Sequence, residues 1–347
     1  MTVALIDAAL RASILLAPAL LWARFSRRSS AAARHAACFV TVLFAAAMPL
    51  LTGLLPDIEI AVLPAVIARA GGAVVPVAGG GWAVLVVGAW LLGALAFGAR
   101  VLGGVARART LCRWAKPVTD ARVLSAAIRA RRELGLEAPI RVLAQRRLAA
   151  PLSWGVIRPV ILLPRGAKQW SRGRLRAVLL HELSHIRRRD CLTQLVADLA
   201  CAVYWFHPLV WLAALRMRVE RERACDDSVV VVGGRPSGYA VLLLRMVKGI
   251  PAGTHTARLS PATTFAASSF ADGGELTGRL RALLGRARDR GSLTPAATLA
   301  FVLGALTLAL PVAAVRLTAQ AAAEPAASPA TAPVAALVTD GPPPPAG

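Results

Sequence analysis

The sequence contains few cysteines, and none stand at a spacing that binds metal. The five cysteines are an odd number and include no CxxC pair. They therefore indicate neither a disulfide framework nor a thiolate zinc site, and we interpret them as reduced thiols. Internal repeats of useful length are also absent, so the sequence indicates no repeat architecture.

Acidic residues are scarce as well, because 18 Asp and Glu stand against 41 Lys and Arg and the formal net charge is +23. At the same time, 56% of the residues are hydrophobic and the mean hydropathy is +0.59. Soluble enzymes rarely combine these properties. A membrane protein combines them when apolar spans alternate with loops that are basic on one side.

The basic excess also fits a second hypothesis, in which clustered Arg side chains neutralise the phosphates of a nucleic acid. No DNA-reading motif accompanies these residues, and apolar spans would have no role in such a protein. We therefore predict no direct nucleic-acid partner. The alternative would require salt-dependent binding of duplex DNA by residues 106–290.

Four segments reach the roughly 20 apolar residues that are needed to cross a bilayer. They lie at residues 3–23, 36–55, 82–105 and 295–315. The first could be mistaken for a signal peptide, but its positive charges follow the apolar run instead of preceding it. We therefore predict that it is retained and that the protein crosses the membrane four times.

The distribution of Lys and Arg predicts the orientation of these spans. Residues 106–290 contain 33 Lys and Arg against 13 Asp and Glu, so +20 of the net charge lies between spans three and four. The loop after span two and the tail after span four each contain one basic residue, Arg69 and Arg316. We predict a plasma (inner) membrane protein whose N-terminus and tail lie outside and whose middle segment is cytoplasmic. The Ala- and Pro-rich tail at 316–347 is predicted to be disordered.

Between spans three and four the pattern becomes that of a mixed α+β domain, which we place at residues 106–290. Residues 121–134 have the apolar spacing of a helix. Residues 140–143 and 160–163 are short apolar runs bounded by Pro and Gly, which predict strands of a small sheet.

The most informative motif lies on a helix that is predicted to run from Ser171, a suitable N-cap, to about Arg189. His181 and His185 stand four residues apart, so both imidazoles project from one helix face and can reach one tetrahedral zinc ion (Zn2+). Glu182 lies beside the first histidine, where its carboxylate can accept a proton from water. An HExxH motif also occurs by chance in helices with two incidental histidines, so a third ligand is needed.

Glu222 is the predicted third ligand, because a His₂Glu set leaves the fourth position open, as a catalytic zinc site requires. Asp226 shares the same helix face at i, i+4 and is predicted to accept a hydrogen bond from a zinc-binding histidine. Glu220 and His207 remain alternative ligands. Cys225 is less suited, since thiolates favour closed structural sites.

Residues 191–217 are apolar enough to be mistaken for a fifth span. If they crossed the bilayer once, His181 and Glu222 would lie on opposite sides of the membrane and could not share a metal. The segment also contains Pro208, which breaks or kinks a helix. We interpret it as a hairpin of two helices that packs in the domain or dips into the membrane.

Several segments together resemble the M56 family of membrane metallopeptidases, which includes the BlaR and MecR antibiotic-response transducers. The resemblance covers residues 148–232 and comprises APLSWG at 150–155, RPVILLP at 158–164, HELSHIRRRD at 181–190, WFHPLVW at 205–211 and ERACD at 222–226. It implies a membrane protein, mainly α, with four transmembrane helices. A cytosolic α+β gluzincin-like zinc peptidase domain would lie between spans three and four.

The resemblance further implies that His181, His185 and Glu222 hold zinc and that Glu182 is the general base in peptide hydrolysis. Well-known members sense a β-lactam outside the cell through a penicillin-binding domain and then lead to inactivation of a cytosolic repressor. We therefore expect a signal-transducing metalloendopeptidase that cleaves a cytosolic, repressor-like protein. Only a short tail follows span four here, so we do not expect antibiotic sensing and leave the stimulus open.

Two other functions fit parts of the pattern. An M48-type quality-control peptidase also combines HExxH with a downstream ExxxD, but WFHPLVW and the Arg189-Asp190 pair favour M56. A non-catalytic membrane transducer would use the helices without turnover. The lipid bilayer is an expected partner, and a homodimer is one option for the oligomeric state. The loop at 251–274 is a second candidate substrate through self-cleavage, with Phe265 or Phe270 in a hydrophobic subsite.

Overall fold

The computed structural model describes residues 2–26, 28–56, 58–63, 81–146, 148, 150–248, 272–285 and 289–319. The chain divides into two compact units, of which the first comprises Met1–Pro56 and Gly79–Ala314 and the second comprises Asp57–Ala78 and Val315–Gly347. The first unit includes both the predicted spans and the predicted zinc domain. Most of the candidate self-cleavage loop, residues 251–271, lies outside the described residues, whereas residues 272–274 begin a helix.

In the part of the chain that the structure describes, four helices are long and apolar enough to cross a membrane. They are α1 (Thr2–Phe25), α2 (Ala31–Leu54), α4 (Gly81–Arg113) and α12 (Pro295–Ala314). All four predicted spans are confirmed as helices. The α4 helix continues past residue 105 to Arg113, because Ala, Leu and Arg all favour the helical backbone.

The α2 and α12 helices run in the same direction. Near their first residues, Ala31 belongs to a cluster that includes Leu293, two residues before the start of α12. Near their last turns, Met48 packs in a cluster with Ala309 and Ala313. A chain that crosses a membrane at each of the four predicted spans would have spans two and four in the same direction for either position of the N-terminus, so the predicted sidedness stays a prediction.

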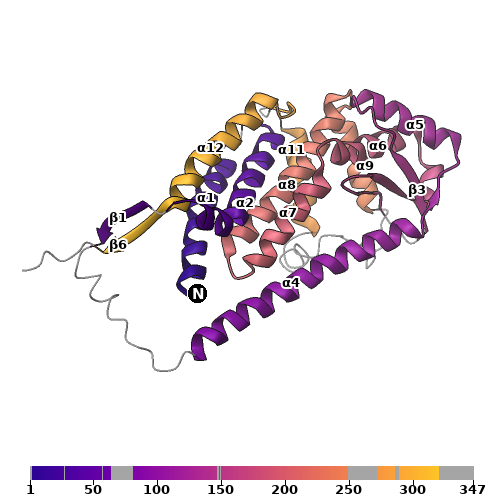
Figure 1. The fold of residues 1–347 in the computed structure, drawn as a ribbon. Coiled ribbons are helices and arrows are strands. Elements are labelled where there is room, and N and C mark those ends of the chain that lie inside the picture. Colours follow the sequence, from indigo (N-terminus) through magenta and orange to yellow (C-terminus); the bar gives the residue numbers. More distant parts are fainter. Residues whose placement is uncertain are drawn as a thin grey trace, which may run out of the picture. The chain divides into compact units, whose positions relative to one another are not determined.

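The hairpin predicted at residues 191–217 is confirmed as two helices, α7 (Asp190–Val203) and α8 (Pro208–Val231), and α8 continues past residue 217. Pro208 lies in the first turn of α8 and does not interrupt a helix. A backbone N–H in that turn has no partner within the helix, so its absence in proline removes no helical hydrogen bond. Three side chains of the turn form hydrogen bonds with the apolar helices. The Tyr204 hydroxyl donates to the Ala45 carbonyl of α2 at 3.0 Å, and the Trp205 indole N–H donates to the Trp90 carbonyl of α4 at 3.2 Å. His207 Nε2 lies 3.0 Å from the Ser13 hydroxyl of α1. The hairpin tip therefore packs among the apolar helices (Figure 1).

The same unit also contains a small sheet with helices beside it. The strands are β2 (Lys116–Pro117), β3 (Arg141–Gln145), β4 (Leu152–Trp154) and β5 (Val160–Pro164), in the order β2-β3-β5-β4. The predicted helix and strands are confirmed by α5 (Ala121–Glu133), β3 and β5, and the two strands pair in parallel. A short 3-10 helix, η1 (Arg165–Gln169), then leads to α6 (Arg172–Arg187), which packs beside the sheet (Figure 1).

Two further helices complete the unit, α9 (Pro236–Lys248) and α11 (Asp272–Leu284). Buried residues of both pack with α6, since Tyr239, Leu243 and Leu283 share a hydrophobic cluster with Leu179 and Leu183. These helices bring residues late in the sequence close to the HExxH helix.

The second unit contains a parallel pair of strands, β1 (Ile58–Leu63) and β6 (Val315–Ala319). The predicted disorder at 316–347 therefore does not hold for residues 316–319. Their pairing partner lies more than 250 residues earlier in the sequence, so local composition could not indicate it. Residues 320–347 lie outside the described residues.

Candidate metal centre

The HExxH motif lies on α6 as predicted, and the helix begins where the sequence indicates. Ser171 is the N-cap, and its side chain accepts a hydrogen bond from the Arg174 backbone N–H at 3.3 Å. Leu175, Leu179 and Leu183 are fully buried against the sheet side of the domain. Burial of this stripe orients the helix and leaves the histidine face toward α8.

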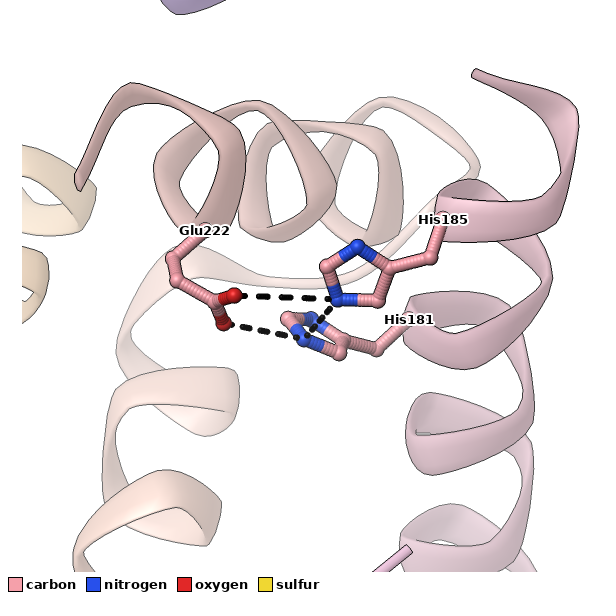
Figure 2. A group of neighbouring side chains, drawn as sticks. All are labelled: His181, His185 and Glu222. Atoms are coloured by element: carbon pink, nitrogen blue, oxygen red, sulfur yellow. Dashed lines mark hydrogen bonds and ion pairs between the residues drawn. The ribbon is translucent and has the colours of Figure 1, made fainter. Parts of the chain in front are cut away.

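Three predicted ligand atoms converge between α6 and α8, as Figure 2 shows. The Nε2 atoms of His181 and His185 are 3.3 Å apart. The Glu222 carboxylate lies 3.6 Å from His181 Nε2 and 3.9 Å from His185 Nε2. Two donors bound to a tetrahedral zinc at about 2.0–2.1 Å lie roughly 3.3–3.4 Å apart. The three side chains therefore stand at distances that fit one zinc ion.

The other nitrogen of each imidazole contacts a separate carboxylate. His185 Nδ1 lies 2.9 Å from Asp190 Oδ2, and His181 Nδ1 lies 3.2 Å from Asp226 Oδ1. An ionised carboxylate can only accept hydrogen bonds, so each Nδ1 is the donor and the proton-bearing nitrogen of its ring. The two Nε2 lone pairs then face each other and the Glu222 carboxylate. Acceptors at these separations repel one another unless a cation lies between them.

The electrostatics of the metal-free site lead to the same conclusion. Burial lowers the pKa of His181, but hydrogen bonds to Asp226 and Glu222 raise it more strongly, to about 10. Without a metal, His181 therefore carries a proton on Nε2 as well as on Nδ1. The proton on Nε2 faces the Glu222 carboxylate, where a metal cation would otherwise lie. Burial raises the pKa of Glu222, but the His181 hydrogen bond and nearby positive charges bring it well below its ordinary value. The carboxylate is therefore ionised at neutral pH and ready to bind a cation.

A second group of potential ligands comprises His185, Asp190 and Cys225. The Cys225 Sγ lies 3.3 Å from His185 Nδ1, which is the nitrogen already bonded to Asp190. Burial and the adjacent Asp190 charge raise the pKa of the Cys225 thiol well above its ordinary value. A metal in this group would displace the hydrogen bond between His185 Nδ1 and Asp190, whereas the set of His181, His185 and Glu222 uses the two Nε2 atoms and keeps both Nδ1 contacts, so the site fits the latter set better.

Glu182 is buried on α6 beside His181, with 8% of its surface exposed. The side chains of the three candidate ligands are partly exposed, at 13% for His181, 14% for His185 and 16% for Glu222. A substrate carbonyl or a water molecule can thus reach the centre while the surrounding groups remain shielded from bulk solvent.

The alternative ligands considered from the sequence lie elsewhere. Glu220 is 1% exposed and forms a buried ion pair with Arg34 at 2.7 Å and a second with Arg223 at 2.9 Å. His207 lies at the hairpin tip, where its Nε2 contacts Ser13 of α1. Neither belongs to the group around His181, and both have structural partners of their own.

The geometry and the sequence motif can now be compared with known proteins. A family model described as "BlaR1 peptidase M56" matches residues 3–268. The chain belongs to the M56 peptidase family. Regulatory protein BlaR1 of Bacillus licheniformis is 41% identical over 83 residues, which are 24% of this chain and 14% of that protein. The methicillin resistance mecR1 protein of Staphylococcus aureus is 24% identical over 86 residues, 24% of this chain and 15% of that protein. Each alignment thus spans a small part of the relative.

Three residues of this M56 centre were not predicted from the sequence. Asp190 holds His185, Tyr239 donates to Asp226 at 2.9 Å, and Arg279 contacts the Asp226 carboxylate at 2.7 Å. Asp190 is the first residue of α7 and lies five residues after His185, so its nearness in the sequence was a usable signal. The other two come from α9 and α11, whose approach to the site depends on tertiary packing that local spacing does not reveal.

Proposed function

We propose that this M56 chain is an integral-membrane zinc metalloendopeptidase with His181, His185 and Glu222 as zinc ligands. The observation that carries the proposal is the convergence of two Nε2 atoms and a carboxylate while each Nδ1 is occupied by its own acidic partner. The fixed tautomers present both Nε2 atoms to a metal ion. Three protein ligands leave the fourth coordination position open, as in catalytic zinc sites.

Bound zinc would supply Lewis-acid chemistry, polarising a peptide carbonyl and making water a better nucleophile near neutral pH. The Glu182 carboxylate takes the proton from the attacking water and delivers it to the leaving amine. Asp226 and Asp190 hold the two imidazoles in the tautomer that presents Nε2 to the metal.

The neighbourhood of the site favours an extended peptide as substrate. One small pocket is lined by Trp154 of β4, by Gly155 and Val156 after it, and by His185 of α6. Among the described strands, β4 pairs with β5 alone and lies at the edge of the sheet, where a peptide strand could add. A polypeptide strand laid along β4 would pass the zinc-binding histidine.

We further propose that the enzyme transduces a signal across the membrane by cleaving a cytosolic, repressor-like regulator. The BlaR1 relative is named a regulatory protein, and the zinc ligands lie in the strongly basic region between spans three and four. The competing proposal is a transducer that binds zinc without turnover, and the loop at 251–274 is a further candidate substrate.

The test is a comparison of cleaved cytosolic proteins in cells that express the wild type or Glu182→Ala. We expect specific new N-termini in the wild type that are absent in the variant, although both chains contain equal zinc. Termini within residues 260–274 of the chain itself would identify self-cleavage. Identical peptide populations in stimulated cells with both zinc-loaded chains would favour the non-catalytic transducer.

A further inference from the structure

Arg279 of α11 contacts two acidic residues of the metal centre at once. Its guanidinium group holds the Asp226 carboxylate with two hydrogen bonds, from Nε to Oδ2 at 2.8 Å and from Nη2 to Oδ1 at 2.7 Å. The remaining nitrogen, Nη1, lies 3.5 Å from Glu222 Oε2. Since the Arg279 side chain is 18% exposed and that of Asp226 is 1% exposed, these contacts are shielded from solvent.

The geometry of this pair restricts Asp226 more than a single ion pair would. A planar guanidinium that bonds both carboxylate oxygens fixes the plane of the carboxylate as well as its distance. Asp226 Oδ1 also accepts from the Tyr239 hydroxyl at 2.9 Å and faces His181 Nδ1 at 3.2 Å. The orientation of the His181 ring therefore depends on a carboxylate that α11 holds in place.

Two other arginines near the site, Arg221 and Arg223, donate hydrogen bonds to side chains other than Asp226. Arg223 on α8 donates a hydrogen bond to Glu220. Arg221 donates to Gln194 at 2.6 Å and also lies 3.4 Å from Glu222 Oε1. Of these three arginines, Arg279 is the one that bonds both oxygens of Asp226. The helix α11 packs closely on α8 next to Arg279. A Cβ on Gly278 would lie only 3.4 Å from the Arg223 side chain of α8, so the missing side chain of Gly278 allows this close approach.

We infer that Arg279 is a positioning residue of the zinc centre and that docking of α11 completes the site. The inference rests on the proposed zinc peptidase function. Arg279 acts through Asp226, which sets the tautomer and direction of His181, and through Glu222, whose carboxylate it steadies. A chain in which α11 is displaced would retain all three zinc ligands and still bind the metal with altered geometry.

The test uses the full-length chain in detergent, loaded with Zn2+ or with Co2+ as a spectroscopic probe. Arg279→Lys retains the charge but loses the two-pronged hydrogen bond, so a change in metal binding reports on geometry. We expect about tenfold weaker zinc binding, in the range found when a partner of a metal-binding histidine is lost, and an altered Co2+ d–d absorption spectrum. Arg281→Lys, an exposed position on the same helix, should behave as the wild type.

A double-mutant cycle with Asp226→Asn separates positioning from general damage to the fold. If Arg279 acts mainly through Asp226, Arg279→Lys should have little further effect in the Asp226→Asn chain. Wild-type affinity and spectrum in Arg279→Lys, or equal losses in both backgrounds, would overturn the inference and leave the zinc peptidase proposal intact. Failure of the wild type itself to bind one metal ion would instead overturn the proposed function, and this inference with it.

Discussion

At the scale of single residues, each imidazole of the proposed zinc site is held by its own carboxylate. Asp190 and Asp226 are both buried and lie on different helices, so the two histidines are oriented independently. Asp190 accepts the shorter contact, at 2.9 Å from His185. Loss of such a partner weakens metal binding because the ring and its tautomer are no longer fixed.

We therefore expect Asp190→Asn to lower zinc affinity by about 10–100-fold while the chain stays folded. Zinc competition with a chromophoric chelator measures this change. Glu137→Gln, at an exposed acidic residue of the same domain, is the control. An affinity equal to that of the control would show that Asp190 does not support His185.

A second prediction concerns the metal-free chain. The pKa of His181 is raised from 6.5 to about 10, so its protonation stabilises the fold fully below pH 6.5, and this contribution is lost as the pH rises toward 10. After removal of zinc with a chelator, the melting temperature should fall over this range. His181→Asn should show a smaller decline under the same conditions. Equal declines in both chains would contradict the raised pKa.

Glu220 and Glu222 lie two residues apart on α8 and should respond differently to substitution. Glu220→Gln leaves Arg34 buried without its partner, which costs about 3–5 kcal/mol of stability, but it should retain zinc. Glu222→Gln should lose most zinc with a small effect on folding. Thermal melting combined with metal analysis checks both. A reversed pattern would make Glu220 the ligand.

At the scale of elements, the sequence predicted helices and strands wherever the signal was local. Ser171 marked the start of α6, Pro208 marked the turn between α7 and α8, and apolar length marked the four spans. Glu222 was predictable because it shares the ExxxD spacing with Asp226. Tyr239 and Arg279 were not, because their helices meet the site only through long-range packing, and β6 depends on a distant partner strand.

The contact between the hairpin tip and α4 allows a test of helix packing. A Cβ on Gly93 would overlap the indole ring of Trp205, whereas the position of a Cβ on Gly98 is open. We expect Gly93→Ala to destabilise the chain by roughly 1–3 kcal/mol through overpacking. Gly98→Ala should be neutral or slightly stabilising, since Ala favours a helix over Gly. Equal melting temperatures for both variants would show that the tip does not pack on α4.

At the scale of the whole molecule, the distribution of charge makes the orientation in the membrane testable. A reporter fused after Gly285 should be cytoplasmic, because +20 of the net charge lies between spans three and four. A reporter fused after Ala335 should lie outside, because α12 separates the two positions. Both reporters on one side of the membrane would mean that α12 does not cross it.

The most direct test of the central claim is the zinc content of the purified chain, measured together with peptide-bond cleavage. We predict one zinc per chain in the wild type and in Glu182→Gln, with cleavage lost in the latter because Glu182 acts on water and not on the metal. His181→Ala, His185→Ala and Glu222→Ala should each lose the zinc. Full zinc occupancy in any of these three variants, or undiminished cleavage by Glu182→Gln, would contradict the account.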